Sequence, residues 1–516
     1  MQRMPPPAAP ASARPWTEPL AAVDLGSNSF RLEIGQIDQG LYRRVDYLKE
    51  TVRLGAGLDA DGMLGEESMQ RGLDCLARFA QRLRGFAPQR MRAVATQTLR
   101  EARNRDAFLA RARGALGLPV EVIAGREEAR LIYAGVARLQ PSDRARLVID
   151  IGGRSTEMIL GRGRTAMRAE SFQVGCVSLS MRWFGDGRFS EAAFRAAQVA
   201  AGAELEEALE PFAPMHWQEA LGSSGTAGSV SQLLVANGIS DGAITADGLR
   251  WCIEQCLRAG RVDRLALAGL KEDRRAVLGG GLAVLYTLVS NFGIPALQPA
   301  RGALRHGVIF ELQERVAARN GAVEGRDLRD DSALALQQRF DVDAAQAARV
   351  QALALRLHAA LQPAAPDDDE ASETVRELGW AAALHEIGMM VSHHDHHRHS
   401  AYLLGHVDAP GFSQSQQRRL AALVLGQRGG LRKVEAQLAG DGFAWQLLAL
   451  RLAVLLCHAR QAPDADAVAI RRSSRSVMLA YDGAWAATHP RTVYLLAEEQ
   501  AAWRRIEGGP QLVLPG

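Results

Sequence analysis

Residues 146–161 combine side chains that could hold a phosphate group and a metal ion. An apolar run at 147–151 is followed by Gly152-Gly153 and then by a second apolar run, which predicts a strand, a turn and a returning strand. Asp150 lies at the end of the first strand, and Glu157 opens the second. Glycine amides approach anions closely, and two carboxylates beside a phosphate require a hard cation such as Mg²⁺. The segment is therefore interpreted as a cradle for phosphate and metal.

The same pattern occurs earlier in the chain. Residues 23–35 align without gaps on residues 149–161, with Asp24 at the position of Asp150. Both copies contain an apolar run, an Asp-x-Gly turn and an apolar return. Because internal similarity indicates repeated structural units, we expect two related domains whose hairpins meet at one cleft.

Strands and helices alternate around the two hairpins, which favours an α/β fold. A helix is predicted from about residue 66 to residue 84, followed by strands at 92–96 and 119–123. A third Gly/Ser/Thr segment, 221–228, precedes a helix and is a candidate anion site at its N-terminus. The glycine-rich segment 278–281 is interpreted as a turn.

Length and composition limit the classes of protein that the chain could belong to. Its 516 residues are enough for several domains, and its formal net charge of +3 creates no overall field that favours nucleic acid. No run of about 20 apolar residues predicts a membrane span. The five cysteines have no zinc-site or disulfide spacing, which favours reduced thiols in the cytoplasm. Peripheral association with the inner membrane through a basic face stays open.

The pattern along the chain predicts four structured parts after a disordered leader at 1–19. The first two, 20–130 and 131–318, are the α/β domains that carry the hairpins. Residues 319–463 have long helical patterns and are expected to form an all-α domain. Short apolar runs at 468–470, 477–480 and 493–496 suggest a small C-terminal β-containing module over 464–516.

A histidine-rich segment, 393–399, lies in the predicted all-α domain. Such tracts can bind metals, but composition alone is weak support. His385-Glu386 stands where a metal phosphohydrolase of the His-Asp class would have His-Asp, so a loop or substrate-surface role is favoured over a second catalytic site. Nearby basic residues could line a groove for a polyanion; they are Arg398, Arg418, Arg419, Arg428, Arg432 and Lys433.

Separate motifs in this chain resemble those of the bacterial exopolyphosphatase / guanosine pentaphosphate phosphohydrolase family of the actin–Hsp70–sugar kinase superfold. The resemblance is continuous from about Ala21 to Arg315 and continues in the C-terminal half. Its motifs are residues 24–30, 95–100, 125–132, 150–157, 175–178, 222–226, 384–388, 398–402 and 410–412. It implies duplicated actin-like (RNase H-like) domains flanking a cleft, an all-α HD-like domain and a small C-terminal α+β module.

The resemblance also implies a mechanism and a set of site residues. Glu128 would be the general base that activates water, Arg100 would neutralise developing charge, and Asp150 and Glu157 would hold Mg²⁺, with stimulation by K⁺. The implied phosphate-binding residues are Asp24, Gly26, Ser27, Asn28, Ser29, Gly152, Gly153, Arg154, Ser155, Cys176, Gly225 and Thr226. Positioning and electrostatic stabilisation are what phosphoryl transfer requires.

One residue departs from the family pattern. The family usually has a third glycine in the second turn, where this chain has Arg154. The guanidinium could contact phosphate with two parallel hydrogen bonds. Alternatively, it crowds the turn and slows turnover.

The expected function is processive removal of terminal phosphate from inorganic polyphosphate. The alternative is hydrolysis of the 5′ γ-phosphate of guanosine pentaphosphate, which would use the same base, metal and turns. A further alternative, from another class, is a non-catalytic sensor of a polyanion or nucleotide. The resemblance implies a homodimer, and no nucleic-acid partner is expected.

Overall fold

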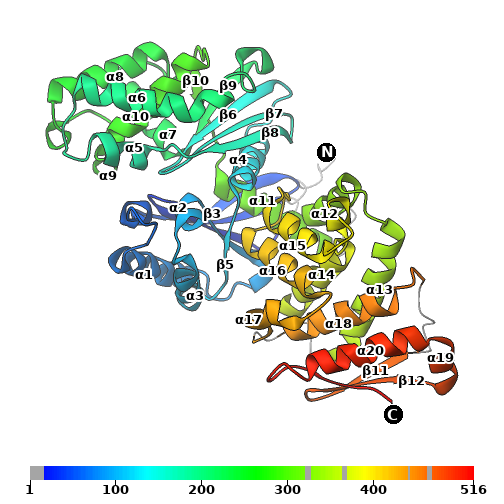
Figure 1. The fold of residues 1–516 in the computed structure, drawn as a ribbon. Helices are drawn as coiled ribbons and strands as arrows, with labels where there is room; N and C mark the ends of the chain where they lie inside the picture. Colours follow the sequence, from blue (N-terminus) through cyan, green and yellow to red (C-terminus); the bar gives the residue numbers. More distant parts are fainter. Residues whose placement is uncertain (1–16, 320–326, 363–368, 440–441, 462–467, 516) are drawn as a thin grey trace, which may run out of the picture. The chain divides into compact units, whose positions relative to one another are not determined.

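The computed structural model describes residues 17–319, 327–362, 369–439, 442–461 and 468–515. These residues form two compact units (Figure 1). The first unit contains the chain up to Val120 and again from Glu128 to Gly325, and the second contains 121–127 and everything from Arg326 onward. Residues 1–16 of the predicted leader lie outside the described residues.

The first lobe of unit 1 is built on a mixed sheet with the neighbouring order β3-β2-β1-β4. Strand β1 pairs antiparallel with β2 and parallel with β4, and β2 pairs antiparallel with β3. These strands are β1 (Leu20–Leu25), β2 (Phe30–Asp38), β3 (Leu41–Glu50) and β4 (Met91–Ala95). All six residues of β1 are buried. The first Asp-x-Gly turn therefore follows a strand that packing holds in place within the sheet.

The second lobe repeats this arrangement with the strand order β10-β9-β6-β7-β8. Strand β6 pairs antiparallel with β7 and parallel with β9, and β7 pairs antiparallel with β8. The strands are β6 (Ala145–Ile151), β7 (Thr156–Arg162), β8 (Thr165–Phe172), β9 (Glu219–Ser223) and β10 (Leu297–Pro299). The predicted internal repeat and the α/β class are therefore confirmed.

The repeat extends to an irregularity in the strands. The register of β2 against β3 shifts between Ile34 and Gly35, and that of β7 against β8 shifts between Leu160 and Gly161. The two glycines occupy equivalent positions in the aligned repeats. A Cβ atom at Gly35 would lie 2.4 Å from the Tyr42 ring, and one at Gly161 would lie 2.2 Å from the Tyr133 ring. Both shifts therefore occur at a glycine, where an aromatic ring packs directly on the backbone.

Helices flank the two sheets (Figure 1). Those of the first lobe are α1 (Glu66–Arg82), α2 (Gln97–Glu101) and α3 (Arg105–Leu116), and the 3₁₀ turn η1 (Leu54–Gly57) precedes them. Helix α4 (Gly125–Leu139) leads to the second lobe, whose helices are α5 (Cys176–Trp183), α6 (Glu191–Leu205), α7 (Ser224–Ala236), α8 (Ala246–Ala259), α9 (Glu272–Arg275) and α10 (Leu278–Asn291). Helix α11 (Leu304–Arg319) follows the second lobe in the chain but packs on strands β1, β2 and β4 of the first. The predicted domain boundary between residues 130 and 131 falls inside α4.

Two glycine-rich segments differ from their predicted structure. The predicted turn at 278–281 is the first turn of α10, and its three glycines are buried. A Cβ atom at Gly280 would lie 2.4 Å from the carbonyl oxygen of Cys176, so these glycines allow α10 to pack closely on α5. The third Gly/Ser/Thr segment is shorter than predicted, because α7 begins at Ser224 and includes Gly225 and Thr226 in its first turn.

Unit 2 consists of helices followed by a small sheet. Its helices are α12 (Leu328–Arg339), α13 (Ala344–Leu361), α14 (Asp369–Ala383), α15 (His396–His406), α16 (Gln414–Gly426), α17 (Glu435–Leu438), α18 (Phe443–Leu456), α19 (Gly483–Thr488) and α20 (Pro490–Trp503), and its strands are β11 (Val468–Ser473), β12 (Ser476–Tyr481) and β13 (Gln511–Val513). The apolar run at 493–496 lies in α20 instead of a strand. One hydrophobic core joins the helices to the sheet, with Leu447, Val477 and Trp503 among its members. The likeness to an HD domain and the boundary at 463 stay predictions.

In the described part of the chain no helix has both the length and the hydropathy to cross a membrane.

A buried ion cluster fixes α4 and α11 to the first sheet. Glu311 of α11 pairs with Arg92 of β4 at 2.8 Å, with Arg315 at 2.7 Å and with Arg130 of α4. Although burial raises the pKa of Glu311, the three guanidinium groups hold it well below its ordinary value. The carboxylate therefore anchors the helix that carries Glu128.

We expect Glu311→Ala to destabilise unit 1 by about 3–5 kcal/mol, because it leaves buried arginines without their counter-charge. The matched control is Glu314→Ala on the same helix. Glu314 is 38% exposed and pairs with Arg138, so its loss should cost less than about 1 kcal/mol. Denaturant unfolding measures both variants, and equal losses would contradict the anchoring role of Glu311.

Candidate active site

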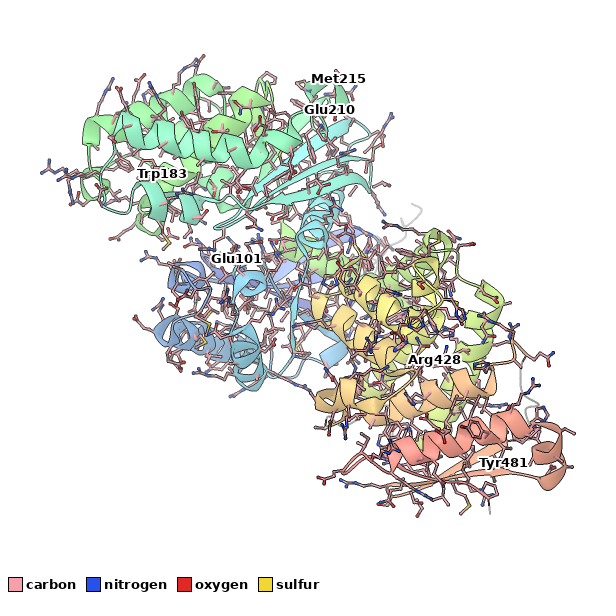
Figure 2. The ribbon with its side chains drawn as sticks, in the orientation of Figure 1. Glu101, Trp183, Glu210, Met215, Arg428 and Tyr481 are labelled. Atoms are coloured by element: carbon pink, nitrogen blue, oxygen red, sulfur yellow. The ribbon has the colours of Figure 1, made fainter. Side chains whose placement is uncertain are left out.

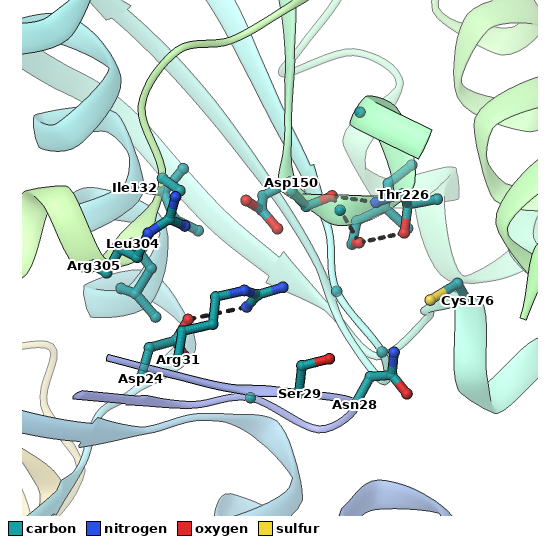
Figure 3. A pocket seen from close by; sticks show the side chains of 18 of the residues that line it. Asp24, Asn28, Ser29, Arg31, Ile132, Asp150, Cys176, Thr226, Leu304 and Arg305 are labelled. Atoms are coloured by element: carbon teal, nitrogen blue, oxygen red, sulfur yellow. Dashed lines mark hydrogen bonds and ion pairs between the residues drawn. The ribbon is translucent and has the colours of Figure 1, made fainter. Parts of the chain in front are cut away.

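The two predicted turns line one cavity of about 320 Å³ in unit 1. Figure 3 shows Asp24, Asn28 and Ser29 of the first lobe opposite Asp150 and Thr226 of the second. Glu128, near the start of α4, also lines this cavity. The structure thus brings the two hairpins together, as the repeat in the sequence led us to expect, and it places Glu128, the base implied by the family resemblance, in the same cavity.

The two hairpins differ at one position that decides their electrostatics. In the first hairpin Asp24 is the register partner of Arg31, and the two side chains form an ion pair at 3.1 Å. In the second hairpin Asp150 is the register partner of Glu157. Directly opposed residues of an antiparallel pair project from the same face of the sheet. The first hairpin is therefore neutral at this point, and the second carries two acidic groups.

The acidic groups of the second lobe are buried and repel one another. Burial raises the pKa of Glu128 to about 7, against the opposing charge of Arg100 and with added repulsion from Asp150 and Asp24. Burial also raises the pKa of Asp150 to about 6, although Ser223 and Arg31 favour its ionised form. Burial, together with the charges of Glu128 and Asp150, raises the pKa of Glu157 well above its usual value.

This donor set fits Mg²⁺. Asp150 lines the cavity, whereas Glu157 is buried beside it and accepts a 2.8 Å hydrogen bond from Ser171. No group of three or more His, Cys, Asp or Glu side chains in the described parts of the chain is arranged to hold a metal. Mg²⁺ is usually bound by one or two carboxylates together with substrate phosphates and water, and Asp150 and Glu157 could provide those carboxylates.

The first turn presents two buried donors to the cavity. Asn28 Nδ2 and Ser29 Oγ are buried and lack a hydrogen-bond partner among the described residues. Buried polar groups are normally paired, so these two are suited to phosphate oxygens. Gly26 and Ser27 line the same cavity, and the carbonyl oxygen of Ser27 accepts a 2.8 Å hydrogen bond from the Gly55 amide.

The second turn is fixed by α5. Amides of Cys176 and Val177 donate to the carbonyl oxygens of Gly152 and Gly153 at 3.0 and 2.7 Å, and the Gly152 amide donates to Ser155 at 2.9 Å. A Cβ atom at Gly175 would lie 2.5 Å from the backbone of Gly153. The turn and the start of α5 are therefore in close backbone contact, and Gly152, Gly153 and Ser155 all line the cavity.

Three further predicted phosphate-binding residues are present in the cavity wall, but some already have partners. Gly225, Thr226 and Cys176 line the cavity. The Thr226 hydroxyl donates to the carbonyl oxygen of Ile151 at 2.9 Å, which holds α7 against β6. Burial raises the pKa of the Cys176 thiol, so this group is not an activated nucleophile.

Two predicted residues, Arg100 and Arg154, are not among the described residues that line the cavity. Arg100 Nη1 donates to Glu128 Oε2 at 2.7 Å, so it contacts the predicted base. Arg154 forms an ion pair with Glu101 at 2.8 Å. The structure therefore places both guanidinium groups against protein carboxylates.

None of the basic residues that line the cavity was predicted from the sequence as a site residue. Six basic and three acidic side chains line it, so its walls suit an anionic ligand; the basic ones are Arg31, Lys49, Lys271, Arg274, Arg301 and Arg305. Arg31 could have been found, because the gapless repeat places it at the position of Glu157. The others come from separate segments that only the fold brings together, so no local pattern identified them.

The histidine-rich segment lies elsewhere, in unit 2. His385, His393 and His396 line a second cavity of about 510 Å³, together with Glu386 and Arg428. Burial lowers the pKa of His396 to about 4, so its ring is neutral at physiological pH. Arg398 and Arg419 of the predicted basic groove pair with Asp395 and Glu377, respectively.

Comparisons with known proteins agree with this architecture. The family model described as "Ppx/GppA phosphatase family" matches residues 34–316, and that described as "Ppx/GppA phosphatase, domain III" matches residues 328–500. An exopolyphosphatase structure from Cytophaga hutchinsonii has a TM-score of 0.53 and 24% identity, and covers 60% of this chain and 100% of its own, which shows a shared fold.

Curated relatives are similar along almost the whole chain. A guanosine-5′-triphosphate,3′-diphosphate pyrophosphatase from Pseudoalteromonas translucida is 36% identical over 94% of this chain and 96% of its own length. One of the same name from Pseudoalteromonas atlantica is 40% identical over 80% of both chains. With these relatives and both family matches, the chain belongs to the Ppx/GppA phosphatase family and is a phosphoric anhydride hydrolase.

Proposed function

We propose that this enzyme hydrolyses the terminal 5′-phosphate of guanosine 5′-triphosphate 3′-diphosphate (guanosine pentaphosphate). The products are inorganic phosphate and the corresponding 5′-diphosphate. The observation that carries the proposal is the position of Glu128, a buried carboxyl group in the wall of a cavity whose two turns suit phosphate oxygens. In-line attack by water at the terminal phosphorus needs a base on one side and stabilised oxygens on the other.

Glu128 is suited to the role of base. A general base works best when its pKa lies near the operating pH, and burial raises the pKa of Glu128 to about 7. In the proposed step the ionised carboxylate takes a proton from water as the water oxygen bonds to the terminal phosphorus. The bond from that phosphorus to the bridging oxygen breaks, and the departing 5′-diphosphate keeps the electron pair. Arg100 holds the base through the 2.7 Å contact between its Nη1 atom and Glu128 Oε2.

Asp150 and Glu157 are the proposed ligands of Mg²⁺. The metal, when bound, would neutralise charge on the phosphate oxygens and on these two carboxylates. The protein's own donors, Asn28 Nδ2 and Ser29 Oγ, would bind phosphate oxygens on the side of the first lobe. Stimulation by K⁺ stays an expectation from the family resemblance.

The names of the relatives support a nucleotide over an inorganic polymer as the substrate, since those that are 34–40% identical are named for the guanosine nucleotide. The cavity wall is compatible with that substrate, because it also contains Lys271, Arg274 and Lys49, the last paired with Asp273 at 3.0 Å. These cations could bind the second, 3′-linked diphosphate of such a nucleotide. The expected activity on polyphosphate is the competing outcome of the first experiment below.

We expect phosphate release from guanosine pentaphosphate to exceed that from long-chain polyphosphate by about 10-fold or more in kcat/KM. In Glu128→Gln the rate should fall about 10²- to 10⁴-fold, because the amide cannot accept the proton. Glu127→Gln is the matched control, since the neighbouring Glu127 is not among the described residues that line the cavity. A preference for polyphosphate would identify an exopolyphosphatase. Binding without release from either substrate would identify a sensor.

The pH dependence of kcat/KM should report the ionisation of Glu128. Activity needs the ionised carboxylate, so kcat/KM should fall as the pH is lowered. The midpoint of this acidic limb of the pH profile should lie at or below about pH 7. Arg100 favours the ionised form, so Arg100→Gln should move this limb to higher pH. Arg103→Gln, an exposed arginine close by in the chain, should leave it in place. A limb that moves to lower pH in Arg100→Gln would contradict the assignment.

Removal of divalent metal with a chelator should abolish phosphate release, and added Mg²⁺ should restore it. In Glu157→Gln we expect the Mg²⁺ concentration for half-maximal rate to rise by about 10-fold or more, since one of two carboxylate ligands is lost. Glu170→Gln, on the adjacent strand β8, is the control. Equal Mg²⁺ requirements in all three proteins would exclude Glu157 as a ligand.

A further inference from the structure

Arg154 connects the two lobes of unit 1. It belongs to the turn between β6 and β7 in the second lobe, but its side chain contacts the first lobe. Its Nε and Nη2 atoms lie 2.9 and 2.8 Å from Glu101 Oε2, at the end of α2. Its Nη1 atom donates to the carbonyl oxygen of Gly55 in η1 at 3.2 Å. Figure 2 shows Glu101 on the side of the first lobe that is nearest the second.

Further hydrogen bonds connect Glu101 to Glu128, the proposed base. Gln97 Nε2 donates to Glu101 Oε1 at 2.6 Å, and Arg100 donates to Gln97 Oε1 from Nε at 2.9 Å and from Nη2 at 2.6 Å. Arg100 Nη1 then donates to Glu128 at 2.7 Å. An unbroken series of side-chain hydrogen bonds therefore links the turn of one lobe to the carboxylate that we assign as base.

Burial and close packing fix the orientation of the side chains in this series of hydrogen bonds. Gln97 is buried, with 6% of its surface exposed, and Arg154 and Glu101 have 21% and 25% of their side chains exposed. A guanidinium that donates to a carboxylate oxygen from Nε and to a backbone carbonyl oxygen from Nη1 has a defined orientation. A Cβ atom at Gly55 would lie only 3.0 Å from Arg154 Cδ, so the arginine stem packs closely on the first lobe. No part of this arrangement directs the guanidinium into the cavity.

We propose that Arg154 is a positioning residue that fastens the second phosphate-binding turn to α2 and thereby aligns Arg100 and Glu128 with the bound phosphate. This differs from both expectations for Arg154, direct phosphate binding and crowding of the turn. Loss of the Arg154–Glu101 contact would remove part of the support of Gln97 and Arg100, so alignment of the base depends on the contact between the lobes. The inference rests on the proposed function for its kinetic readout.

A double-mutant cycle tests the coupling between the two ends of the contact. The variants are Arg154→Gly, Glu101→Ala and the double variant, with kcat and KM measured on the substrate that the wild type hydrolyses. We expect each single variant to lower kcat by about 10-fold or more with little change in KM, since small misplacements of a catalytic group have effects of this size. The double variant should be no slower than either single one. Arg154→Lys, which keeps the charge but not the planar guanidinium that contacts both Glu101 and Gly55, should recover part of the loss.

Other outcomes would overturn the inference. A higher KM in Arg154→Gly with Glu101→Ala unaffected would show direct phosphate binding, and a higher kcat in Arg154→Gly would show crowding. Independent, multiplicative losses would show that the two residues are not coupled. A lower thermal stability with kcat unchanged would leave only a structural contact.

A second measurement does not depend on the substrate. Hydrogen–deuterium exchange of the amides in 97–101 should be faster in Arg154→Gly and in Glu101→Ala than in the wild type, because both variants release α2 from the turn. Unchanged exchange overturns the inference even if guanosine pentaphosphate is hydrolysed. Faster exchange in a protein that fails to hydrolyse guanosine pentaphosphate would instead reject the proposed function and keep the contact.

Discussion

Three buried carboxyl groups, those of Asp150, Glu157 and Glu128, repel one another in unit 1. Burying charge without a counter-charge is costly, and neighbouring carboxylates hold their protons more strongly than isolated ones. Burial and this repulsion raise the pKa of Glu128, and the divalent cation that we propose would relieve the repulsion. The distances between the three carboxyl groups depend on the register of the second hairpin and on the position of α4. Arg100 then fixes the side chain of Glu128. The ion cluster around Glu311 holds α4, which carries one of the three groups.

The duplicated hairpins show how one structural unit can acquire two roles. Both have the same strand pairing, the same Asp-x-Gly turn and a register shift at the equivalent glycine. They differ where the partner of the aspartate is Arg31 in the first copy and Glu157 in the second. This difference separates a hairpin whose aspartate is paired with an arginine from a hairpin with two opposed carboxyl groups. Basic residues on both lobes then make the whole cavity suitable for an anion.

Much of the fold and part of the site could be predicted from the sequence. The hairpins were predicted because apolar strands and glycine turns are local patterns, and the repeat predicted that they would meet. The segment 278–281 was misinterpreted, since glycine marks a turn in sequence but here allows close packing of two helices. Lys49, Lys271 and Arg274 had no local signature, because surface cations look alike until the chain folds around them. The direction of the Arg154 side chain depends on Glu101, more than fifty residues earlier in the chain, and no pattern around the turn indicated that contact.

In the mechanism that we propose, water activated by Glu128 attacks the terminal phosphorus of the bound 5′-triphosphate. Single-turnover hydrolysis of guanosine pentaphosphate in ¹⁸O-labelled water, analysed by mass spectrometry, tests this step most directly. We expect one ¹⁸O atom in the released inorganic phosphate and none in the nucleotide product. Label in the nucleotide would place the attack on another phosphorus atom and would contradict the assignment of the cavity, its base and its two turns.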